Sequence, residues 1–221
     1  MKTKALVLTC SLLLACAAGL AFASVRIYDN NFTSRSDAKA LELNGKGCEA
    51  EVRGNKKQLG VRTEEGSSRC RLRLPVQGDA ARPDHIIQAD GKLLPRTDEQ
   101  VRKRVYLGLT VREGGGGFYE LRVYPERREY RLVRKPEGEG FPVEARDNAI
   151  GKTGEANRFT LRAIGGEVSA NVNRLAVGPV ADPAANDLSG TKLSLVLGQE
   201  GRSNEGARAW FSNLSVKVPN P

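Results

Sequence analysis

The chain has 221 residues, of which 28% are charged and 5% aromatic, and its formal net charge is +9 at pH 7. One histidine and a few widely separated cysteines exclude a zinc constellation and a Ser/His/Asp triad. The positive charge suits a polyanionic partner, but arginines occur in nearly every segment, often beside glutamates, which favours solvated strand faces over one basic patch.

The N-terminus has the pattern of an export signal. A short basic segment, residues 1–4, precedes an apolar run over residues 5–15. We therefore expect residues 1–23 to be a signal peptide, a lipoprotein signal or an anchor. The protein is expected to be periplasmic, at the bacterial cell surface or secreted.

Three fates of this leader remain open. Ala23 ends a small-x-small motif that an ordinary signal peptidase would cleave. Cys16 ends a segment that resembles a bacterial lipobox, so it is a candidate for acylation. Residues 5–23 are uncharged and just long enough to stay as an uncleaved anchor.

Cys48 and Cys70 are the only cysteines beyond the leader. Cys48 shares a strand face with Val52, and Cys70 shares one with Leu72, so both thiols are expected to point to the apolar side. This pattern predicts a disulfide between two early strands that closes a loop of about 22 residues. Two buried free thiols are the alternative.

In the first half of the chain, apolar and polar residues alternate in short segments separated by turn residues, which predicts strands. Asp90 and Gly91 are predicted to form a turn, and Thr97 with Gln100 to cap one helical turn. His85, with no motif around it, is expected at the surface. Strands are expected at residues 25–32, 41–43, 48–52, 59–61, 70–74 and 85–89.

The clearest pattern is a hairpin in the middle of the chain. Val105 to Arg112 and Phe118 to Tyr124 alternate between apolar and polar residues on either side of four glycines. Residues 135–156 are rich in glycine and proline and are expected to form a surface connection. Later strands are expected at residues 129–133, 157–163, 168–172, 175–177, 192–197 and 209–218. The regular spacing of turns predicts an all-β sandwich or barrel.

The second half of the chain carries a family resemblance in the segments 106–112, 118–123, 157–163, 168–173 and 209–216. In this order they resemble the successive strands of concanavalin A-like domains, the lectin and glucanase superfamily that includes laminin G-like and bacterial 3-keto-disaccharide hydrolase-like domains. The resemblance implies an all-β, antiparallel two-sheet jelly-roll β-sandwich over residues 24–221, preceded by the hydrophobic leader. It also implies a frequent role in sugar binding.

Two features depart from that family pattern. Asn173 is followed by Arg174 where a glycine is usual, and the Glu-x-Asp-x-x-Glu motif of glucanases is absent. Glycosidases need two carboxyl groups across the scissile bond. Glu120 has no obvious acidic partner, and beside Arg122 it fits a cross-strand ion pair. We therefore predict a protein that is not an enzyme and holds no cofactor and no metal.

A binding face is the better hypothesis, because sugar sites combine aromatic rings with planar hydrogen-bonding groups. Trp210 is out of phase with Phe211 and in phase with Leu214, so both an exposed and a core position are open. An ordinary solvated sheet is the alternative for the whole face. The candidate ligand residues are Tyr106, Arg112, Glu120, Arg122, Tyr124 and Trp210, with Thr110 beside them on the hairpin.

The sequence thus predicts an exported module that binds a glycan or another acidic envelope polymer without catalysis. A hydrolase of the 3-keto-disaccharide class and a structural or protein-interaction module are the alternatives. Nucleic acid is not an expected partner of an exported protein. Membrane contact is expected only through the leader, if it is uncleaved or lipidated.

Overall fold

The computed structural model describes residues 24–64, 66, 68–76, 83–95, 99–114, 116–201 and 205–220. The leader, including Cys16, lies outside these residues, so its processing remains a prediction. None of the described helices has the length and apolar character needed to cross a bilayer.

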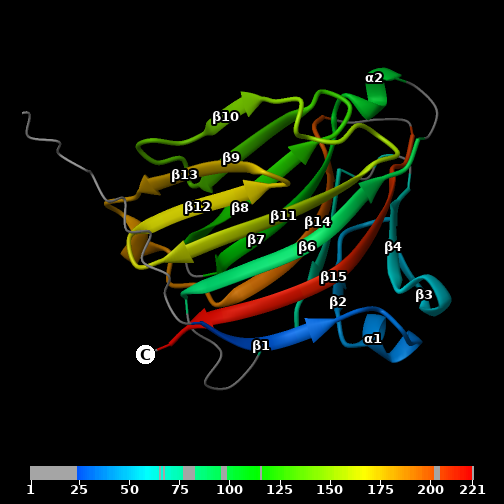
Figure 1. Ribbon diagram of the computed structural model, residues 1–221, viewed down its shortest axis with the longest axis horizontal. Helices are drawn as coiled ribbons and strands as arrows, with labels where there is room; N and C mark the ends of the chain where they lie inside the picture. The colour runs from blue at the N-terminus through cyan, green and yellow to red at the C-terminus, as the bar shows by residue number, and fades with distance from the viewer. Residues whose placement is uncertain are drawn as a thin grey trace, which may run out of the picture.

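In the described part of the chain, the strands form two antiparallel sheets that pack face to face (Figure 1). One sheet has seven strands, in the order β10 (Val143–Arg146), β9 (Glu129–Lys135), β8 (Gly117–Tyr124), β7 (Val105–Gly114), β14 (Lys192–Gln199), β5 (Arg69–Arg73) and β2 (Glu42–Asn44). The predicted central hairpin, β7 and β8, lies in the middle of this sheet.

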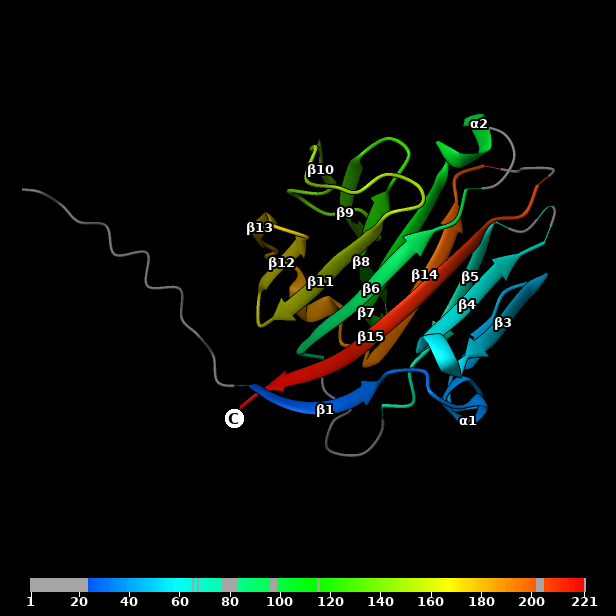
Figure 2. The same cartoon turned by 45° about the vertical axis from the view of Figure 1, so that its right-hand side comes forward.

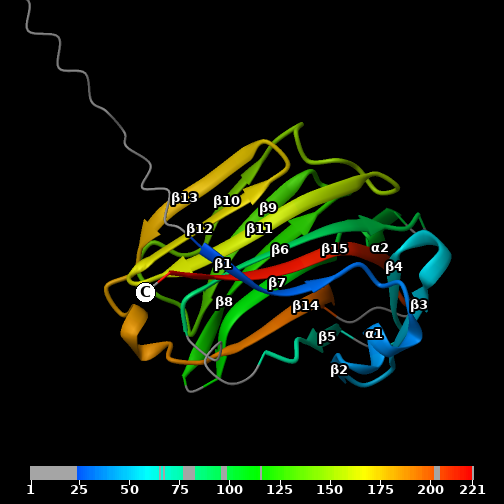
Figure 3. The same ribbon diagram turned by 60° about the horizontal axis from the view of Figure 1, so that its bottom comes forward.

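The other sheet has eight strands, and the first and last strands of the described chain meet in it (Figure 3). β1 (Ser24–Asn30) pairs with the last strand, β15 (Arg208–Pro219), outside the main order of the sheet. That order is β13 (Leu175–Ala181), β12 (Glu167–Val172), β11 (Ala156–Ile164), β6 (His85–Leu93), β15, β4 (Gln58–Thr63) and β3 (Cys48–Arg53).

Neighbouring strands are often far apart in sequence. β7 lies between β8 and β14, and β6 lies between β11 and β15, so the chain passes repeatedly from one sheet to the other (Figure 2). The prediction of an all-β, antiparallel two-sheet sandwich is therefore confirmed. The helical segments are short: α1 (Arg35–Lys39), η1 (Gly54–Lys56), α2 (Glu99–Arg102) and η3 (Ala185–Asp187).

The core lies between the sheets and consists mainly of leucine and valine, with a few aromatic rings. Alternate residues of each strand point inward because successive side chains of a strand point to opposite faces. Burial of one large apolar side chain contributes about 1.5 to 3 kcal/mol. Fully buried examples are Leu107, Leu109, Leu121, Leu195 and Leu197 from the seven-stranded sheet, and Ile87, Phe159, Leu161 and Phe211 from the other.

A buried polar cluster also lies at the inner face of the seven-stranded sheet. Arg134 of β9 donates from Nε to Oδ2 of Asp182 at 2.7 Å, and the Tyr119 hydroxyl donates to the same oxygen. The guanidinium of Arg134 also donates to the carbonyl oxygens of Pro136 and Ala184. Because the ion pair is almost completely buried, it fixes the segment after β13 to β8 and β9.

The predicted disulfide is confirmed. Cys48 of β3 and Cys70 of β5 are bonded, with their Cα atoms 5.6 Å apart. Since β3 belongs to the eight-stranded sheet and β5 to the seven-stranded sheet, the bond joins the two layers of the sandwich.

Replacing both cysteines, Cys48→Ala with Cys70→Ala, is expected to lower the free energy of unfolding by about 3 kcal/mol. The reason is that the bond closes a loop with a sequence separation of 22 residues in the unfolded chain. Urea denaturation of the double variant and the parent protein measures the difference. An unchanged denaturation midpoint would contradict the assigned role.

Several local predictions were wrong. His85 is completely buried rather than at the surface, because β6 lies inside the sheet and His85 shares its inward face with Ile87. Asp90 and Gly91 do not form a turn, since β6 continues to Leu93. The connection after β9 contains the edge strand β10, and α1 was not expected.

Candidate functional site

A second apolar cluster lies on the outer face of the seven-stranded sheet, turned away from the core. It consists of Tyr106 on β7, Tyr124 on β8 and Val196 on β14. The centres of the two tyrosine rings are 5.3 Å apart. The ring of Tyr106 lies directly against Gly198, its partner residue on β14, where a Cβ atom would overlap the ring.

Gly198→Ala is therefore expected to displace the Tyr106 ring and to lower the free energy of unfolding by about 1 to 3 kcal/mol, the usual cost of overpacking. Near-ultraviolet circular dichroism would report the tyrosine environment, and urea denaturation would report the stability. Gly166→Ala is the matched control, because its φ lies outside the left-handed region and an added Cβ atom would come no closer than 3.7 Å to atoms beyond its chain neighbours. Unchanged spectra and stability would show that the ring does not lie against Gly198.

Arginine side chains cover these tyrosines. The Arg122 guanidinium lies 5.0 Å from the centre of the Tyr106 ring, and that of Arg127 lies 4.0 Å from the Tyr124 ring. Tyr106 is 4% exposed and Tyr124 is 0% exposed. The structure therefore brings the two predicted aromatic residues together but does not present them as an open platform.

Three glutamates lie beneath the arginines, and we call them the carboxylate layer: Glu113, Glu120 and Glu129. Each has a nearly buried side chain. Glu120 accepts a 2.8 Å hydrogen bond from Nε of Arg122, pairs with Arg69, and accepts a bond from the Thr110 hydroxyl. The prediction that Glu120 forms ion pairs with arginine is confirmed, but the pair with Arg122 lies within β8, and the partner on another strand is Arg69 of β5.

The other two glutamates are held in the same way. Glu113 accepts a 2.7 Å hydrogen bond from Nη1 of Arg71 and another from the Ser194 hydroxyl. Glu129 accepts a 2.8 Å bond from Nε of Arg131. Each carboxylate thus has an arginine partner and at least one further contact on this face.

Six arginines form the solvent side of the same face, and we call them the arginine layer. They are 17–29% exposed, in contrast to the carboxylates below them. They come from β5, β8, β9 and the turn between β8 and β9. The arginine layer is Arg69, Arg71, Arg73, Arg122, Arg127 and Arg131.

Burial and neighbouring charges shift the pKa of two groups on this face, Tyr124 and Arg69. Burial raises the pKa of Tyr124 above its ordinary value, and the carboxylate of Glu200, which accepts a 2.7 Å bond from its hydroxyl, adds to the effect. Burial lowers the pKa of Arg69 to about 10; Tyr106 opposes this shift, whereas the like charges of Arg71 and Arg122 add to it. Both groups keep their protons at neutral pH.

Arg112 does not lie on this face, contrary to the prediction. A register shift follows Val111, and Arg112 adopts a positive φ of 54°, which turns its side chain away from the alternation of β7. Its guanidinium donates to Oδ1 of Asp84 at 2.6 Å and to the carbonyl oxygen of Gly165 at 2.7 Å. Arg112 therefore joins β7 to the loops before β6 and after β11 of the other sheet, and it is 3% exposed.

Trp210 lies on the other sheet, so it does not join Tyr106 and Tyr124. Its ring approaches Gly60 of β4, and the Arg53 guanidinium lies 4.0 Å from the ring centre. A register shift after Ser212, with Asn213 at a φ of 51°, reverses the alternation along β15. This shift explains how Trp210 and Leu214 can point to opposite faces of one strand.

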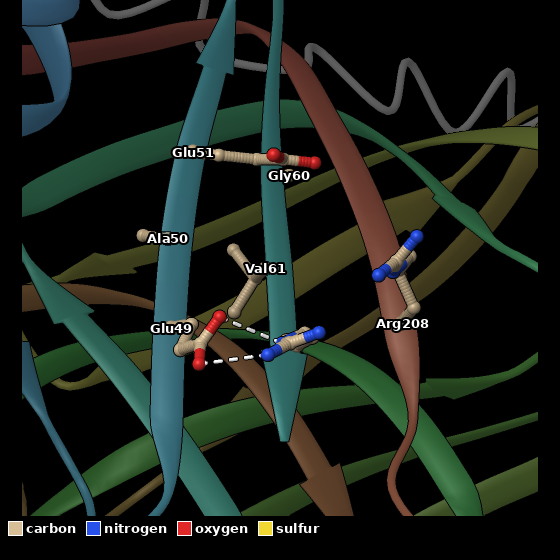
Figure 4. A pocket seen from close by; sticks show the side chains of 7 residues that line it. Glu49, Ala50, Glu51, Gly60, Val61 and Arg208 are labelled. Carbon is tan, nitrogen blue, oxygen red and sulfur yellow. Dashed lines mark hydrogen bonds and ion pairs between the residues drawn. The ribbon is translucent and has the colours of Figure 1, made fainter. Parts of the chain in front are cut away.

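A small pocket of about 70 Å³ lies near Trp210, on β3, β4 and β15 (Figure 4). Its lining includes Glu49, Arg62 and Arg208. Arg62 of β4 and Glu49 of β3 are partner residues in the sheet, and Nε of Arg62 lies 2.7 Å from a carboxylate oxygen of Glu49. This exposed pair offers a comparison for the ion pairs of the seven-stranded sheet.

Within the described residues, no group of three or more histidine, cysteine, aspartate or glutamate side chains is arranged to hold a metal ion.

Sequence reasoning did not single out the arginines of β5. Arg69, Arg71 and Arg73 alternate with Cys70 and Leu72, so their common direction follows from the period of a strand. In the sequence they are among the arginines that occur in nearly every segment, which favoured solvated strand faces over one basic patch. Only the pairing of β5 with β14 places them beside the central hairpin.

The two sheets have the architecture of a concanavalin A-like jelly roll. No protein-family model and no curated protein matches the chain by sequence. Among solved structures, a Bacillus subtilis protein of unknown function with a galectin-like fold matches with a TM-score of 0.63 and 13% identity, over 89% of this chain and 98% of that one.

Two further solved structures share the fold. The catalytic domain of an endo-1,3-β-glucanase (laminarinase) from Thermotoga petrophila matches with a TM-score of 0.62 and 11% identity, over 90% of this chain and 100% of that one. The carbohydrate-binding module CBM66 of Bacillus subtilis matches with a TM-score of 0.52 and 12% identity, over 79% and 97%. At these identities the likeness concerns the fold alone.

Proposed function

We propose that the protein is an exported, non-catalytic carbohydrate-binding module that holds its ligand on the arginine layer. The observation that carries this proposal is the concentration of planar hydrogen-bonding groups on one sheet face. Guanidinium groups such as those of Arg71 and Arg122 present several N–H donors in a fixed plane. A carbohydrate-binding module and a laminarinase domain with the same fold are consistent with a glycan ligand.

The contacts of the carboxylates favour binding over hydrolysis. A glycosidase needs one carboxyl group that holds a proton and a second one placed across the glycosidic bond. Glu113, Glu120 and Glu129 instead each form an ion pair with arginine. Their burial beneath the arginine layer also separates them from a ligand on this face.

Export is supported by the disulfide between Cys48 and Cys70, because such bonds persist in oxidising compartments. An exported protein would meet glycans of the cell envelope or of the surroundings. The proposed ligand and the proposed location are therefore compatible.

A glycan array that includes peptidoglycan fragments and acidic polysaccharides tests this function with the full chain. We expect selective binding that Arg122→Gln weakens at least tenfold, because this arginine lies at the centre of the face. Arg62→Gln, which removes the same charge from the other sheet, is expected to bind like the parent protein.

Two results would contradict the proposal. Turnover of a bound glycan by the parent protein would favour the hydrolase alternative. The absence of binding to every glycan, with a folded protein, would favour a structural or protein-interaction module.

A further inference from the structure

The layering of charge on the seven-stranded sheet determines what an approaching ligand meets first. The side chains of Glu113, Glu120 and Glu129 are 9%, 0% and 6% exposed, whereas those of Arg71 and Arg131 are 27% and 29% exposed. The glutamates therefore neutralise part of the positive charge of the arginines from the buried side. An approaching ligand first meets the guanidinium groups of the arginine layer.

The compensation is incomplete. The arginine layer has six positive charges, while the carboxylate layer and Glu200 supply four negative ones. At the edges of the face, Glu42 and Glu144 pair with arginines of the layer and add two negative charges. Arg146 and Lys192 lie beside these two glutamates and add two positive charges, so the difference stays the same. Counted over the residues that the structure describes, a positive excess of two charges remains on the face.

The hydrogen bonds also leave donor capacity. A guanidinium has five N–H donors. Within the described part of the chain, the bond from Arg71 to Glu113 uses one of them, and the bond from Arg122 to Glu120 also uses one. Two parallel N–H groups of one guanidinium match the two oxygens of a carboxylate or sulfate.

The position of the arginines suits a chain rather than a single small ion. Arg69, Arg71 and Arg73 are alternate residues on β5, so their Cα atoms follow one another at about 6.6 Å along the strand. β14 and β7 separate them from Arg122 on β8. The guanidinium groups thus extend over several strands instead of converging on one point.

We infer that the ligand of this face is an anionic polysaccharide, whose carboxylate or sulfate groups bind guanidinium groups of the arginine layer. The inference rests on the proposed function and deepens it, because it names the class of glycan. Charge-assisted hydrogen bonds to the anionic groups provide the main selectivity for acidic over neutral glycans. The buried rings of Tyr106 and Tyr124 pack against the guanidinium groups of Arg122 and Arg127 and hold them in position.

Calorimetric titration of the full chain tests the inference with four probes. Tetragalacturonate carries carboxylates, sulfated dextran oligosaccharides carry sulfates, and dextran and laminarin oligosaccharides are neutral. We expect at least one acidic probe to bind tenfold or more tightly than either neutral probe at 0.15 M salt. The preferred acidic probe also identifies whether carboxylate or sulfate is the recognised group.

Three variants separate a specific site from general charge. Arg71→Gln is expected to weaken binding of the preferred acidic probe about tenfold. Arg71→Lys keeps the charge but not the planar pair of donors, so we expect it to lose part of the affinity. Arg62→Gln lowers the net charge equally on the other sheet and is expected to change the Kd less than twofold. Circular dichroism and thermal unfolding would establish that each variant is folded.

The outcomes distinguish this inference from the function beneath it. Neutral probes that bind as tightly as acidic ones would overturn the inference and leave a carbohydrate-binding module. An equal loss in folded Arg71→Gln and Arg62→Gln would also overturn it, because general charge would then explain the binding. The absence of binding to all four probes and to the array would overturn both proposals.

Discussion

Arg134→Met is expected to lower the free energy of unfolding by about 3 to 5 kcal/mol, because it leaves the Asp182 carboxylate buried without its cation. The side chains of this pair are only 5% and 1% exposed. The substitution also removes the donors to Pro136 and Ala184. Urea denaturation at pH 7 measures the loss.

The same pair makes the stability of the folded protein depend on pH. Burial alone would raise the pKa of Asp182, but hydrogen bonds from Tyr119 and Arg134 hold it below its ordinary value of 3.8. A carboxyl group with a lower pKa in the folded state stabilises the protein above its unfolded pKa, and this contribution is lost as the pH falls through the folded pKa. We therefore expect the parent protein to lose stability below about pH 4, and Asp182→Asn to lose less over that range.

Arg26→Met is a matched control, because Arg26 pairs with Asp29 at the surface, where both side chains are about half exposed. Its expected effect is below about 1 kcal/mol. An Arg134→Met protein that is as stable as the Arg26→Met protein would show that the buried pair does not fix the segment after β13.

Glu120→Gln is expected to have the second large effect, a loss of about 2 to 3 kcal/mol. It removes the charge that Arg69 and Arg122 share, and hydrogen bonds to charged groups contribute more than neutral ones. Glu120 is completely buried, so water cannot replace the lost partner. Chemical denaturation would measure the loss.

Glu49→Gln on the other sheet is the matched control for this substitution. Glu49 also pairs with an arginine across two strands, but both side chains are about 39% and 52% exposed. We expect its effect to lie within about 1 kcal/mol. Equal effects of the two substitutions would contradict the idea that the carboxylate layer neutralises a buried set of arginines.

The strands of the second half could be predicted because apolar and polar residues alternate over most of the length of each strand. Leu107, Leu109 and Leu121 define one buried face, and a strand has only two faces. The disulfide was predictable for the same reason. His85 was misplaced because its burial depends on both neighbours of β6, β11 and β15, which are distant in the sequence.

The candidate site was predicted only in part. Tyr106, Glu120, Arg122 and Tyr124 share the face that the alternation of the hairpin indicated. Arg112 and Trp210 were misplaced because backbone irregularities interrupt the period of two. Asn213 is of a residue type that often adopts a positive φ, so that irregularity had a sequence signal, whereas a positive φ at an arginine such as Arg112 is uncommon.

The arginine layer itself could not be predicted from local pattern. β5 and β8 are not neighbours in the sequence, and β14 and β7 lie between them in the sheet. Only this order places Arg69 close enough to share Glu120 with Arg122. A scattered set of charges in the sequence thus becomes one surface in the fold.

The central claim is that the arginine layer holds the ligand. Nuclear magnetic resonance of the arginine Nε–Hε groups tests it most directly, during titration of the full chain with tetragalacturonate. We predict that the signals of Arg71, Arg73 and Arg122 shift with saturation, while those of Arg62 and Arg158 on the other sheet stay in place. Saturable shifts confined to Arg62 and Arg158 would contradict the claim.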